Sequence, residues 1–403
     1  MTLMLFIGKG GTGKTTCALA TALKLAEKGK TLVASTDVAH SLSDVLGVNL
    51  MKTNHVEGNL YATQIDVYKE SLESYGTLGK YFKDILEELQ LDPTIIASDL
   101  STLVGLEEFV SLLKIQEFME SDYDYVVLDC PPSGASIRML ALPDLVNRRI
   151  QRMIRTERRK SRAKRILSLT DEREDELYDQ LDNITEKAIQ SKEILYDTEK
   201  TLIRLVLNPD EPSLLETERT FSFLSLHGFN TDCIILNKFY DGETPNQFLE
   251  KLKNRHAKYA EEINKVFSPL KVLKAPMQEE EIKGVDALRK FAQQLYDDNG
   301  VTDPSIPMVE EKPVEFITDK EQVTVKVYLP GLRKEDFDIS RERDILHIGA
   351  RTIFGRIDKK VYLPPNLVGK KIQEKASFEE NILEITFEKE GSEEEGEKEG
   401  EGS

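Results

Sequence analysis

Residues 8–16 read GKGGTGKTT. They follow a short apolar run, Leu3–Ile7, and open a helical pattern over Thr15–Lys28 that ends at Gly29. A strand, a glycine-rich loop and a helix in that order are the context that the pattern G-x-x-x-x-G-K-[ST] requires. The stretch therefore predicts a loop that binds the phosphates of a nucleotide.

Each position of this loop has a physical role in binding phosphate. The glycines let the backbone approach the phosphates closely, and the start of the helix adds its positive dipole end. Lys14 can reach the β- and γ-phosphates, and the Thr15 hydroxyl can ligate Mg²⁺. The predicted nucleotide-binding residues of the loop are Gly10, Gly11, Thr12, Gly13, Lys14, Thr15 and Thr16.

The same glycines also fit a dinucleotide-binding pattern. Gly8, Gly10 and Gly13 satisfy G-x-G-x-x-G, and Asp37 lies near the position at which a dinucleotide fold places its ribose-binding acid. From the motif alone, a nicotinamide-dinucleotide enzyme is therefore the alternative. The pair Lys14-Thr15 favours an ATPase, because the dinucleotide pattern has no use for that pair.

Residues 1–300 alternate strand-length apolar runs with helical patterns. This alternation predicts an α/β domain in which a mainly parallel sheet has helices on both faces. The predicted strands are Leu3–Ile7, Thr31–Ser35, Leu60–Ile65, Tyr125–Asp129, Leu202–Leu207, Cys233–Asn237 and Leu270–Leu273. Asp37 and Asp129 lie at the carboxyl ends of two of them, where open α/β sheets bind ligands.

The pattern changes near residue 300. Residues 301–313 contain three prolines, which predicts a linker. Residues 314–389 alternate apolar and polar positions between turn residues, which predicts a small antiparallel all-β sandwich. Residues 390–403 consist of Glu, Gly, Lys and Ser only, which predicts a disordered acidic tail.

Composition narrows the function classes. A net charge of -18 opposes general nucleic-acid binding, and we expect no sequence-specific nucleic-acid partner. No apolar run reaches the length of a membrane span, so we expect a soluble cytoplasmic protein and not an integral membrane protein. Cys17, Cys130 and Cys233 are scattered and form no C-x-x-C pair, so neither a disulfide framework nor a zinc site is expected.

Several segments resemble one family of ATPases. The two lysines of the loop, Lys9 and Lys14, resemble the deviant Walker A loop of a group of dimeric ATPases. The residues that follow two of the strands, 35–45 and 128–134, resemble the two switch segments of the arsenite-pump ATPase family. That family includes the ATPase that targets tail-anchored membrane proteins. The further matching segments are residues 215–219 and the pair Asn237-Lys238.

The resemblance, which covers residues 1–300, implies a homodimer that uses ATP as substrate and Mg²⁺ as cofactor. ATP would close the dimer and hydrolysis would reopen it. By resemblance, Lys9 would reach the partner's nucleotide as a catalytic cation, and Asp37 would orient the attacking water. Asp129 would hold Mg²⁺ through water, Thr15 would ligate it directly, and Asn237 would contact the adenine.

In the targeting ATPases of this family, helices after the second switch form a hydrophobic groove. The pattern over Leu145–Leu169 is amphipathic and rich in arginine. Its apolar face either holds a hydrophobic helix or protein client or packs on neighbouring helices of the same chain. Residues 145–200 are the region that the resemblance assigns to a client. We therefore expect a carrier or chaperone related to tail-anchored protein targeting. The alternative is an ATPase that regulates or matures a soluble partner. An arsenite-pump subunit is less favoured, because the cysteines lack the spacing of an arsenite site.

Residues 314–389 resemble the α-crystallin domain of small heat-shock proteins. The likeness lies in VYLPGL, residues 327–332, and in the segment from Ala376 to Leu383, where Asn381 stands in place of the family's glycine. Some branches of the targeting-ATPase family are fused to such a domain, and this chain resembles a member of one.

Overall fold

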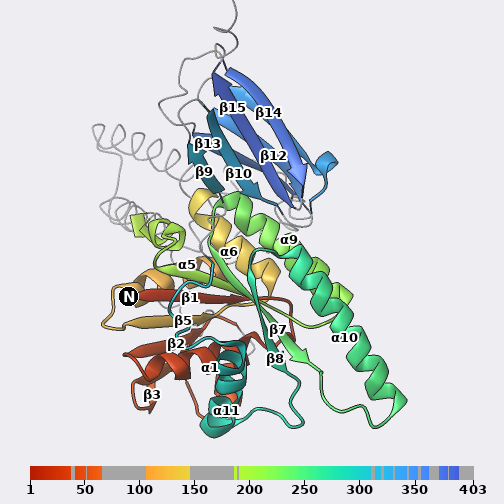
Figure 1. The fold of residues 1–403 in the computed structure, drawn as a ribbon. Coiled ribbons are helices and arrows are strands. Elements are labelled where there is room, and N and C mark those ends of the chain that lie inside the picture. The colour runs from red at the N-terminus through yellow and green to blue at the C-terminus, as the bar shows by residue number, and fades with distance from the viewer. Residues whose placement is uncertain are drawn as a thin grey trace, which may run out of the picture. The chain divides into compact units, whose positions relative to one another are not determined.

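The structure of the chain is a computed structural model (Figure 1). It describes residues 1–37, 41–50, 52–65, 106–145, 186–187, 190–309, 314–318, 322–329, 332–342, 345–352, 355–362, 372–379 and 381–389. Most of the expected client region and the expected acidic tail lie outside the described residues. So do residues 38–40 of the first switch segment.

The chain divides into two compact units. One consists of Met1–Thr220 with Phe229–Glu310, and the other consists of Phe221–Gly228 with Glu311–Ser403. The first unit holds the glycine-rich loop.

The first unit is built on a sheet of eight described strands in the order β3-β4-β2-β5-β1-β6-β7-β8. Every neighbouring pair is parallel except β3 with β4. The strands are β1 (Thr2–Ile7), β2 (Thr31–Ser35), β3 (Asn54–Glu57), β4 (Leu60–Gln64), β5 (Tyr125–Asp129), β6 (Thr201–Leu207), β7 (Thr231–Phe239) and β8 (Lys271–Pro276). The predicted mainly parallel sheet is confirmed.

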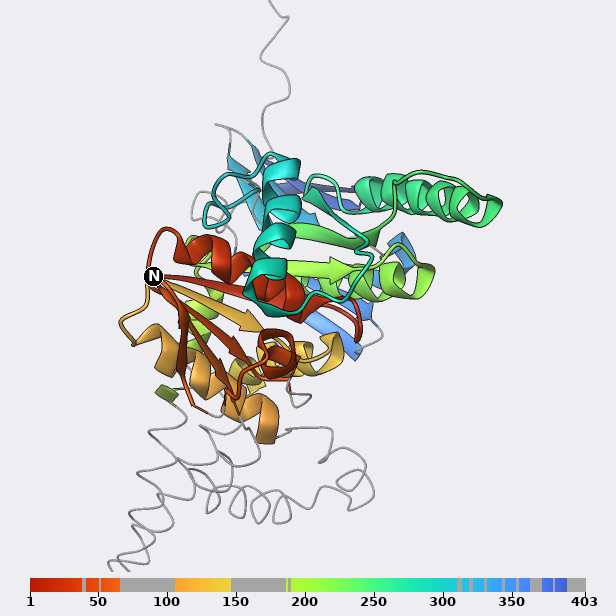
Figure 2. The same ribbon diagram turned by 90° about the horizontal axis from the view of Figure 1, so that it is seen from below.

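Helices cover both faces of this sheet. In Figure 1, α1 and α11 lie on one face, and α5 and α6 lie on the other. The helices are α1 (Lys14–Ala26), α2 (Ser41–Leu46), α5 (Leu106–Met119), α6 (Ser133–Leu145), α9 (Glu211–His227), α10 (Gln247–Val266) and α11 (Gly284–Tyr296), followed by the short 3-10 helix η2 (Asp297–Asn299). The last part of α9, from Phe221, belongs to the second unit. Figure 2, seen from below, shows α10 extending beyond the sheet.

The core of the first unit explains why the central strands are apolar along their whole length. All described residues of β2 and β6 are buried, since helices cover both of their faces. Apolar residues of α1 and α11 pack together with residues of β1, β2 and β5 in one cluster. Among the described residues, no helix combines the length and the hydropathy that crossing a membrane would require.

The described part of the predicted linker packs on the first unit. Val301 and Val309 are buried. The backbone N–H of Met308 donates to Asp232 Oδ1 at 2.6 Å, and the Pro304 carbonyl accepts from Arg204 Nη2 at 2.5 Å. Arg204 and Asp232 form a fully buried ion pair at 2.8 Å. Residues 301–309 therefore supply hydrogen-bond partners to a buried charge pair.

The second unit contains two antiparallel sheets and confirms the predicted β sandwich. Their orders are β14-β15-β10-β9 and β11-β12-β13. The strands are β9 (Val314–Thr318), β10 (Gln322–Tyr328), β11 (Phe337–Glu342), β12 (Ile345–Thr352), β13 (Gly355–Tyr362), β14 (Ile372–Glu379) and β15 (Ile382–Lys389). Val323, Val325 and Val327 are buried in alternation with less buried residues, as period-two patterning requires.

Asn381 occupies a backbone conformation that suits glycine. Its φ is 64°, in the left-handed region, and it lies directly before β15. Asparagine tolerates this region better than most residues with a side chain. The replacement of the family's glycine at this position is therefore compatible with the turn between β14 and β15.

Candidate functional site

The glycine-rich loop joins the end of β1 to the start of α1. Gly11 and Gly13 have φ values of 81° and 93°, which residues with side chains rarely adopt. A Cβ atom on Gly8 would lie 2.1 Å from the Val206 carbonyl oxygen, and one on Gly13 would lie 2.2 Å from Asn237 Nδ2. Positive φ angles and close neighbours therefore account for three of these glycines, while Gly10 is exposed with open space around it.

The Lys9 carbonyl is the centre of hydrogen bonding inside the loop. It accepts from Thr12 Oγ1 at 2.9 Å, from the Thr12 N–H at 3.3 Å and from Lys14 Nζ at 3.4 Å. The Lys14 ammonium thus points into the loop, and its side chain is buried. With the amino end of α1 directly behind it, the loop presents positive charge and N–H groups, an arrangement that can bind an anion.

The side chain of Lys9 is placed differently from that of Lys14. Lys9 is partly exposed, and among the described residues none accepts a hydrogen bond from its ammonium group. The structure therefore separates the two lysines: one ammonium lies inside the loop, and the other is free of partners in the described part of the chain.

Asp129 lies at the end of β5, between the ends of β1 and β2. The strand register places it beside both Phe6 and Ser35. Its Oδ2 accepts from Thr15 Oγ1 at 2.8 Å and from Ser35 Oγ at 3.1 Å, and the residue is fully buried. Burial raises the pKa of Asp129 to about 6, although the hydrogen bond from Thr15 and the charge of Lys14 oppose the shift.

These groups fit a magnesium ion. Asp129 Oδ1 is buried and has no partner in the described part of the chain. It lies on the same carboxylate that the Thr15 hydroxyl contacts, so a carboxylate and a hydroxyl oxygen are close together next to the phosphate-binding loop. Mg²⁺ prefers oxygen ligands and usually keeps several waters, which suits one hydroxyl ligand with a carboxylate behind a water.

Asp37 follows β2 at the same edge of the sheet. Its N–H donates to Ser35 Oγ at 3.2 Å, so Ser35 contacts both Asp37 and Asp129. Its carbonyl accepts from Gln64 Nε2, at the end of β4, at 2.8 Å. The structure brings the two predicted acidic residues to one place, and it adds Gln64, which the sequence reasoning missed.

The end of β7 contacts the outer side of the loop. Asn237 Nδ2 donates to the Thr12 carbonyl at 2.7 Å, and Lys238 Nζ donates to the Gly11 carbonyl at 2.8 Å. The amide nitrogen of Asn237, which the family resemblance assigns to adenine, is thus bonded to the loop. Lys238 was not among the predicted site residues, and the Asn237-Lys238 pair in the sequence was the signal for it.

A cavity of about 660 Å³ adjoins the loop. It lies between the start of α1, the end of β7 and the segment from β8 to α11. Its lining includes Gly13, Thr16, Asn237, Lys238, Met277 and Ile282. This volume is within the range of small-ligand sites, and the cavity begins where the glycine-rich loop ends. It can therefore hold the part of a nucleotide that extends from the phosphates.

Ser133 joins the second predicted switch segment to two other elements. It begins α6, its N–H donates to the Gly8 carbonyl at 3.2 Å, and its hydroxyl donates to the Glu216 carboxylate on α9. The segment after Asp129 is thus tied both to the glycine-rich loop and to α9, which contains the matching residues 215–219.

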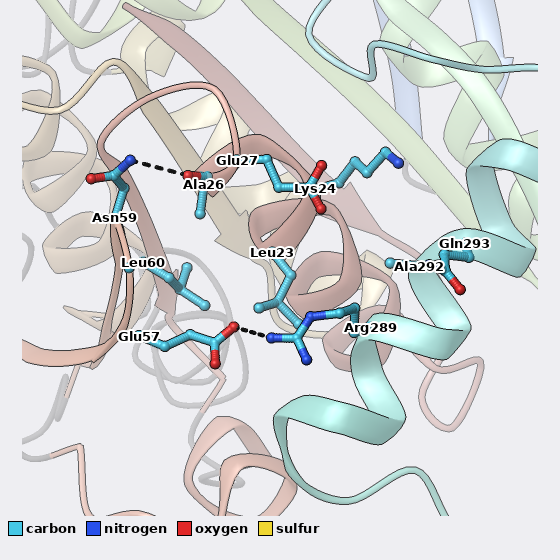
Figure 3. Close-up of a pocket in the computed structure, with 11 residues that line it drawn as sticks. Leu23, Lys24, Ala26, Glu27, Glu57, Asn59, Leu60, Arg289, Ala292 and Gln293 are labelled. Atoms are coloured by element: carbon cyan, nitrogen blue, oxygen red, sulfur yellow. Dashed lines mark hydrogen bonds and ion pairs between the residues drawn. The ribbon is translucent and has the colours of Figure 1, made fainter.

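A smaller cavity of about 270 Å³ lies at the opposite end of α1 (Figure 3). Charged side chains in its lining pair with described neighbours: Arg289 with Glu57, and Lys24 with Asp297. Because it is formed by the last turns of α1, by α11 and by the β3–β4 turn, it is separate from the loop that begins α1.

Comparison with known proteins finds a matching family model for each of the two units. The family model described as "Anion-transporting ATPase" matches residues 1–297, and the model described as "HSP20-like domain found in ArsA" matches residues 320–387. A protein of Chlorobaculum tepidum named "Putative arsenical pump-driving ATPase" is 34% identical over 404 residues, with 96% of each chain covered. "ATPase GET3A" of Arabidopsis thaliana is 30% identical, covering 71% of this chain and 81% of its own. "ATPase ASNA1 homolog" of Trypanosoma cruzi is 28% identical, covering 72% and 89%.

Proposed function

Since the chain belongs to the anion-transporting ATPase family and carries that family's HSP20-like C-terminal domain, we propose that it is an ATP-switched carrier of hydrophobic client proteins. In this proposal MgATP closes a homodimer across the nucleotide sites, and hydrolysis reopens it. The alternative dinucleotide function is set aside, because the family and the named relatives are ATPases.

The observation that carries the proposal is the different placement of the two lysines of the loop. Lys14 points into the loop that would hold the phosphates, so that site already has a cation. The ammonium of Lys9, which has no partner among the described residues, is then available to a second subunit. A cation that reaches a γ-phosphate from outside stabilises the charge that develops on the transferred phosphoryl group. A contact of this kind is lost with the γ-phosphate, which would couple hydrolysis to reopening.

In each site, Mg²⁺ would be held by the Thr15 hydroxyl and, through water, by Asp129, and it would neutralise phosphate charge. Asp37 would orient the attacking water, from a position that Ser35 and Gln64 fix through the Asp37 backbone. Asn237 and Thr16 would meet the adenosine part in the larger cavity.

The cysteines favour a protein client over an arsenic compound, although the name of the Chlorobaculum tepidum relative refers to an arsenical pump. Arsenite binds thiolates that are accessible and close together. All three thiols of the chain are free and fully buried, and burial raises their pKa. Cys17 lies in α1 and Cys233 lies in β7, and both belong to one closed apolar cluster, while Cys130 follows β5. Their burial is therefore what withholds these thiols from an arsenic compound.

The client role is tested with a defined probe. A soluble carrier protein ending in a leucine-rich helix of about 20 residues, the length of a membrane span, is mixed with the Asp37→Asn protein in the presence of MgATP or of MgADP. A matched probe has charged residues spread along the same helix. We expect ATP-dependent binding of the leucine-rich probe alone. Equal binding of both probes, or binding that ignores the nucleotide, would favour an ATPase that acts on a soluble partner.

A further inference from the structure

Two consecutive residues at the end of β7 hold two consecutive carbonyl groups of the glycine-rich loop. Asn237 Nδ2 donates to the Thr12 carbonyl at 2.7 Å, and Lys238 Nζ donates to the Gly11 carbonyl at 2.8 Å. Donors and acceptors are more than two hundred residues apart in the sequence, so these contacts are a product of the fold.

The backbone at Lys238 is unusual for a residue with a long side chain. Its φ is 54°, in the left-handed region, and the pairing of β7 with β8 is irregular between Leu236 and Phe239. In a regular strand, neighbouring side chains point to opposite faces. The turn of the backbone at Lys238 breaks this alternation, so that both side chains reach the same loop. Strained conformations of this kind persist where surrounding contacts fix them, and they cluster at functional sites.

Holding these carbonyls determines where the N–H groups of the loop point. A peptide unit is planar and trans, so its C=O and its N–H point in opposite directions. When the Gly11 and Thr12 carbonyls face β7, the N–H groups of Thr12 and Gly13 point away from β7. The Thr12 N–H is directed away from β7, since it closes a turn with the Lys9 carbonyl at 3.3 Å. A loop binds phosphate through N–H groups that point inward.

We propose that Lys238 is a positioning residue that keeps the glycine-rich loop in its phosphate-binding form from outside. The proposal rests on the assignment of this loop as the phosphate site, and it does not depend on the client. The Lys238 ammonium is exposed and bonds to protein backbone. Its effect on phosphate is therefore indirect, and it differs from the direct effect of Lys14.

A different role for Lys238 makes a different prediction. Its side chain also lines the larger cavity beside the loop, where it would meet the base of a nucleotide. A residue that contacts the base affects ATP and leaves inorganic tripolyphosphate, which has no base, unaffected. A residue that holds the loop affects both ligands by the same factor.

The test compares four variants with the wild-type protein. Lys238→Met removes the donor and keeps the strained backbone, Lys238→Gly removes both, and Lys238→Arg keeps a cation. Lys253→Met is the matched control, because Lys253 also donates to a backbone carbonyl, that of Gly242 at 3.0 Å, but in a loop next to α10. The measurements are the Kd values for MgATP and for tripolyphosphate, each by competition with a fluorescent nucleotide, and the Tm.

We expect Lys238→Met to lower the affinity for both ligands by the same factor, roughly tenfold. This is the size typical of a lost hydrogen bond to a charged group. Lys238→Gly should lose as much affinity while its Tm rises, because glycine removes the backbone strain. Lys238→Arg should recover most of the affinity, and Lys253→Met should match the wild type.

Three results would overturn the role of Lys238: a loss confined to ATP, unchanged affinity in Lys238→Met, or recovery of affinity in Lys238→Gly. A wild-type protein that bound neither ligand would instead overturn the assignment of the phosphate site itself.

Discussion

The Thr15 hydroxyl donates to Asp129 Oδ2 at 2.8 Å and thereby joins the first turn of α1 to the end of β5. The residues are 114 positions apart in the sequence, and they meet because β1, which leads into the loop, pairs with β5. The other carboxylate oxygen of Asp129 is buried without a partner among the described residues. The site is thus formed with one acceptor left for a ligand.

As the pH decreases, Asp129 should make the nucleotide-free protein more stable and the enzyme less active. Burial raises its pKa from 3.8 to about 6. The folded state therefore binds a proton more readily than the unfolded state, and stability should rise as the pH falls from 7 to 5. Over this range the gain is about 1.4 kcal/mol, because pH 5 lies one unit below the folded-state pKa and one pKa unit corresponds to about 1.4 kcal/mol. ATPase activity should fall over the same range, because a protonated Asp129 has lost the negative charge that attracts Mg²⁺ and its bound water.

The check is the urea midpoint of nucleotide-free protein between pH 5 and pH 8, for the wild type and for Asp129→Asn. The variant should lose this part of the pH dependence and be more stable than the wild type at pH 7.5. Parallel curves for the two proteins would show that Asp129 ionises as an ordinary exposed carboxyl group does.

Lys14→Ala and Asp37→Asn should separate binding from turnover. The Lys14 ammonium lies inside the loop and would contact phosphate in the ground state, so its loss should weaken ATP binding at least tenfold. Asp37 would act on water at the reaction step, so Asp37→Asn should bind ATP normally and turn over slowly. Equilibrium binding together with single-turnover hydrolysis measures both. An equal loss of affinity in the two variants would remove the role given to Asp37.

The first unit should require residues 301–309. A chain that ends at Glu310 should keep the ATPase activity of the first unit and melt at a higher temperature than a chain that ends at Asn299. A chain that ends at Asn299 loses the carbonyl of Pro304 and the N–H of Met308 that serve Arg204 and Asp232. Each buried polar group left without a partner costs about 1–3 kcal/mol. If the two truncated proteins melted at the same temperature, residues 301–309 would be a linker only.

Arsenite should leave the ATPase activity unchanged. The three thiols are buried and their pKa values are raised. They therefore stay protonated, and a metalloid binds the ionised thiolate. The measurement is steady-state hydrolysis with increasing arsenite, with Cys130→Ala as the comparison, since Cys130 directly follows Asp129. Stimulation that disappears in Cys130→Ala would contradict the preference for a protein client.

The sequence was sufficient for features that depend on local patterns. Patterns among neighbouring residues predict the glycine-rich loop, the apolar strands and the period-two sandwich. The fold and the family follow from these features. The contacts of Asn237, Lys238 and Gln64 could not be read in this way, because they come from distant strands whose order only the folded sheet fixes.

The packing of residues 301–309 was also hidden, since prolines in a polar stretch are typical of linkers. The sequence does contain one sign of this packing. Arg204 interrupts the apolar strand β6, and a buried charge must have partners. Asp232, Tyr296 and the Pro304 carbonyl are those partners in the structure.

The central claim is that Lys9 acts on the nucleotide of a partner subunit. Lys9→Ala should bind ATP nearly normally and hydrolyse it slowly, with a loss on the order of 10³-fold if Lys9 acts as an arginine finger does. The control is Lys24→Ala, which removes a lysine on α1 that pairs with Asp297 outside the site and should leave activity unchanged.

The most direct measurement mixes Lys9→Ala subunits with Asp37→Asn subunits and follows ATP hydrolysis by heterodimers verified by two affinity tags. In each heterodimer, one site has its own Asp37 and the partner's intact Lys9, and the other site lacks both. We predict that activity returns to about half of the wild-type value per dimer, because one of the two sites is complete. If verified heterodimers remain as inactive as the two parents, Lys9 serves its own site, and the proposed closing mechanism is contradicted.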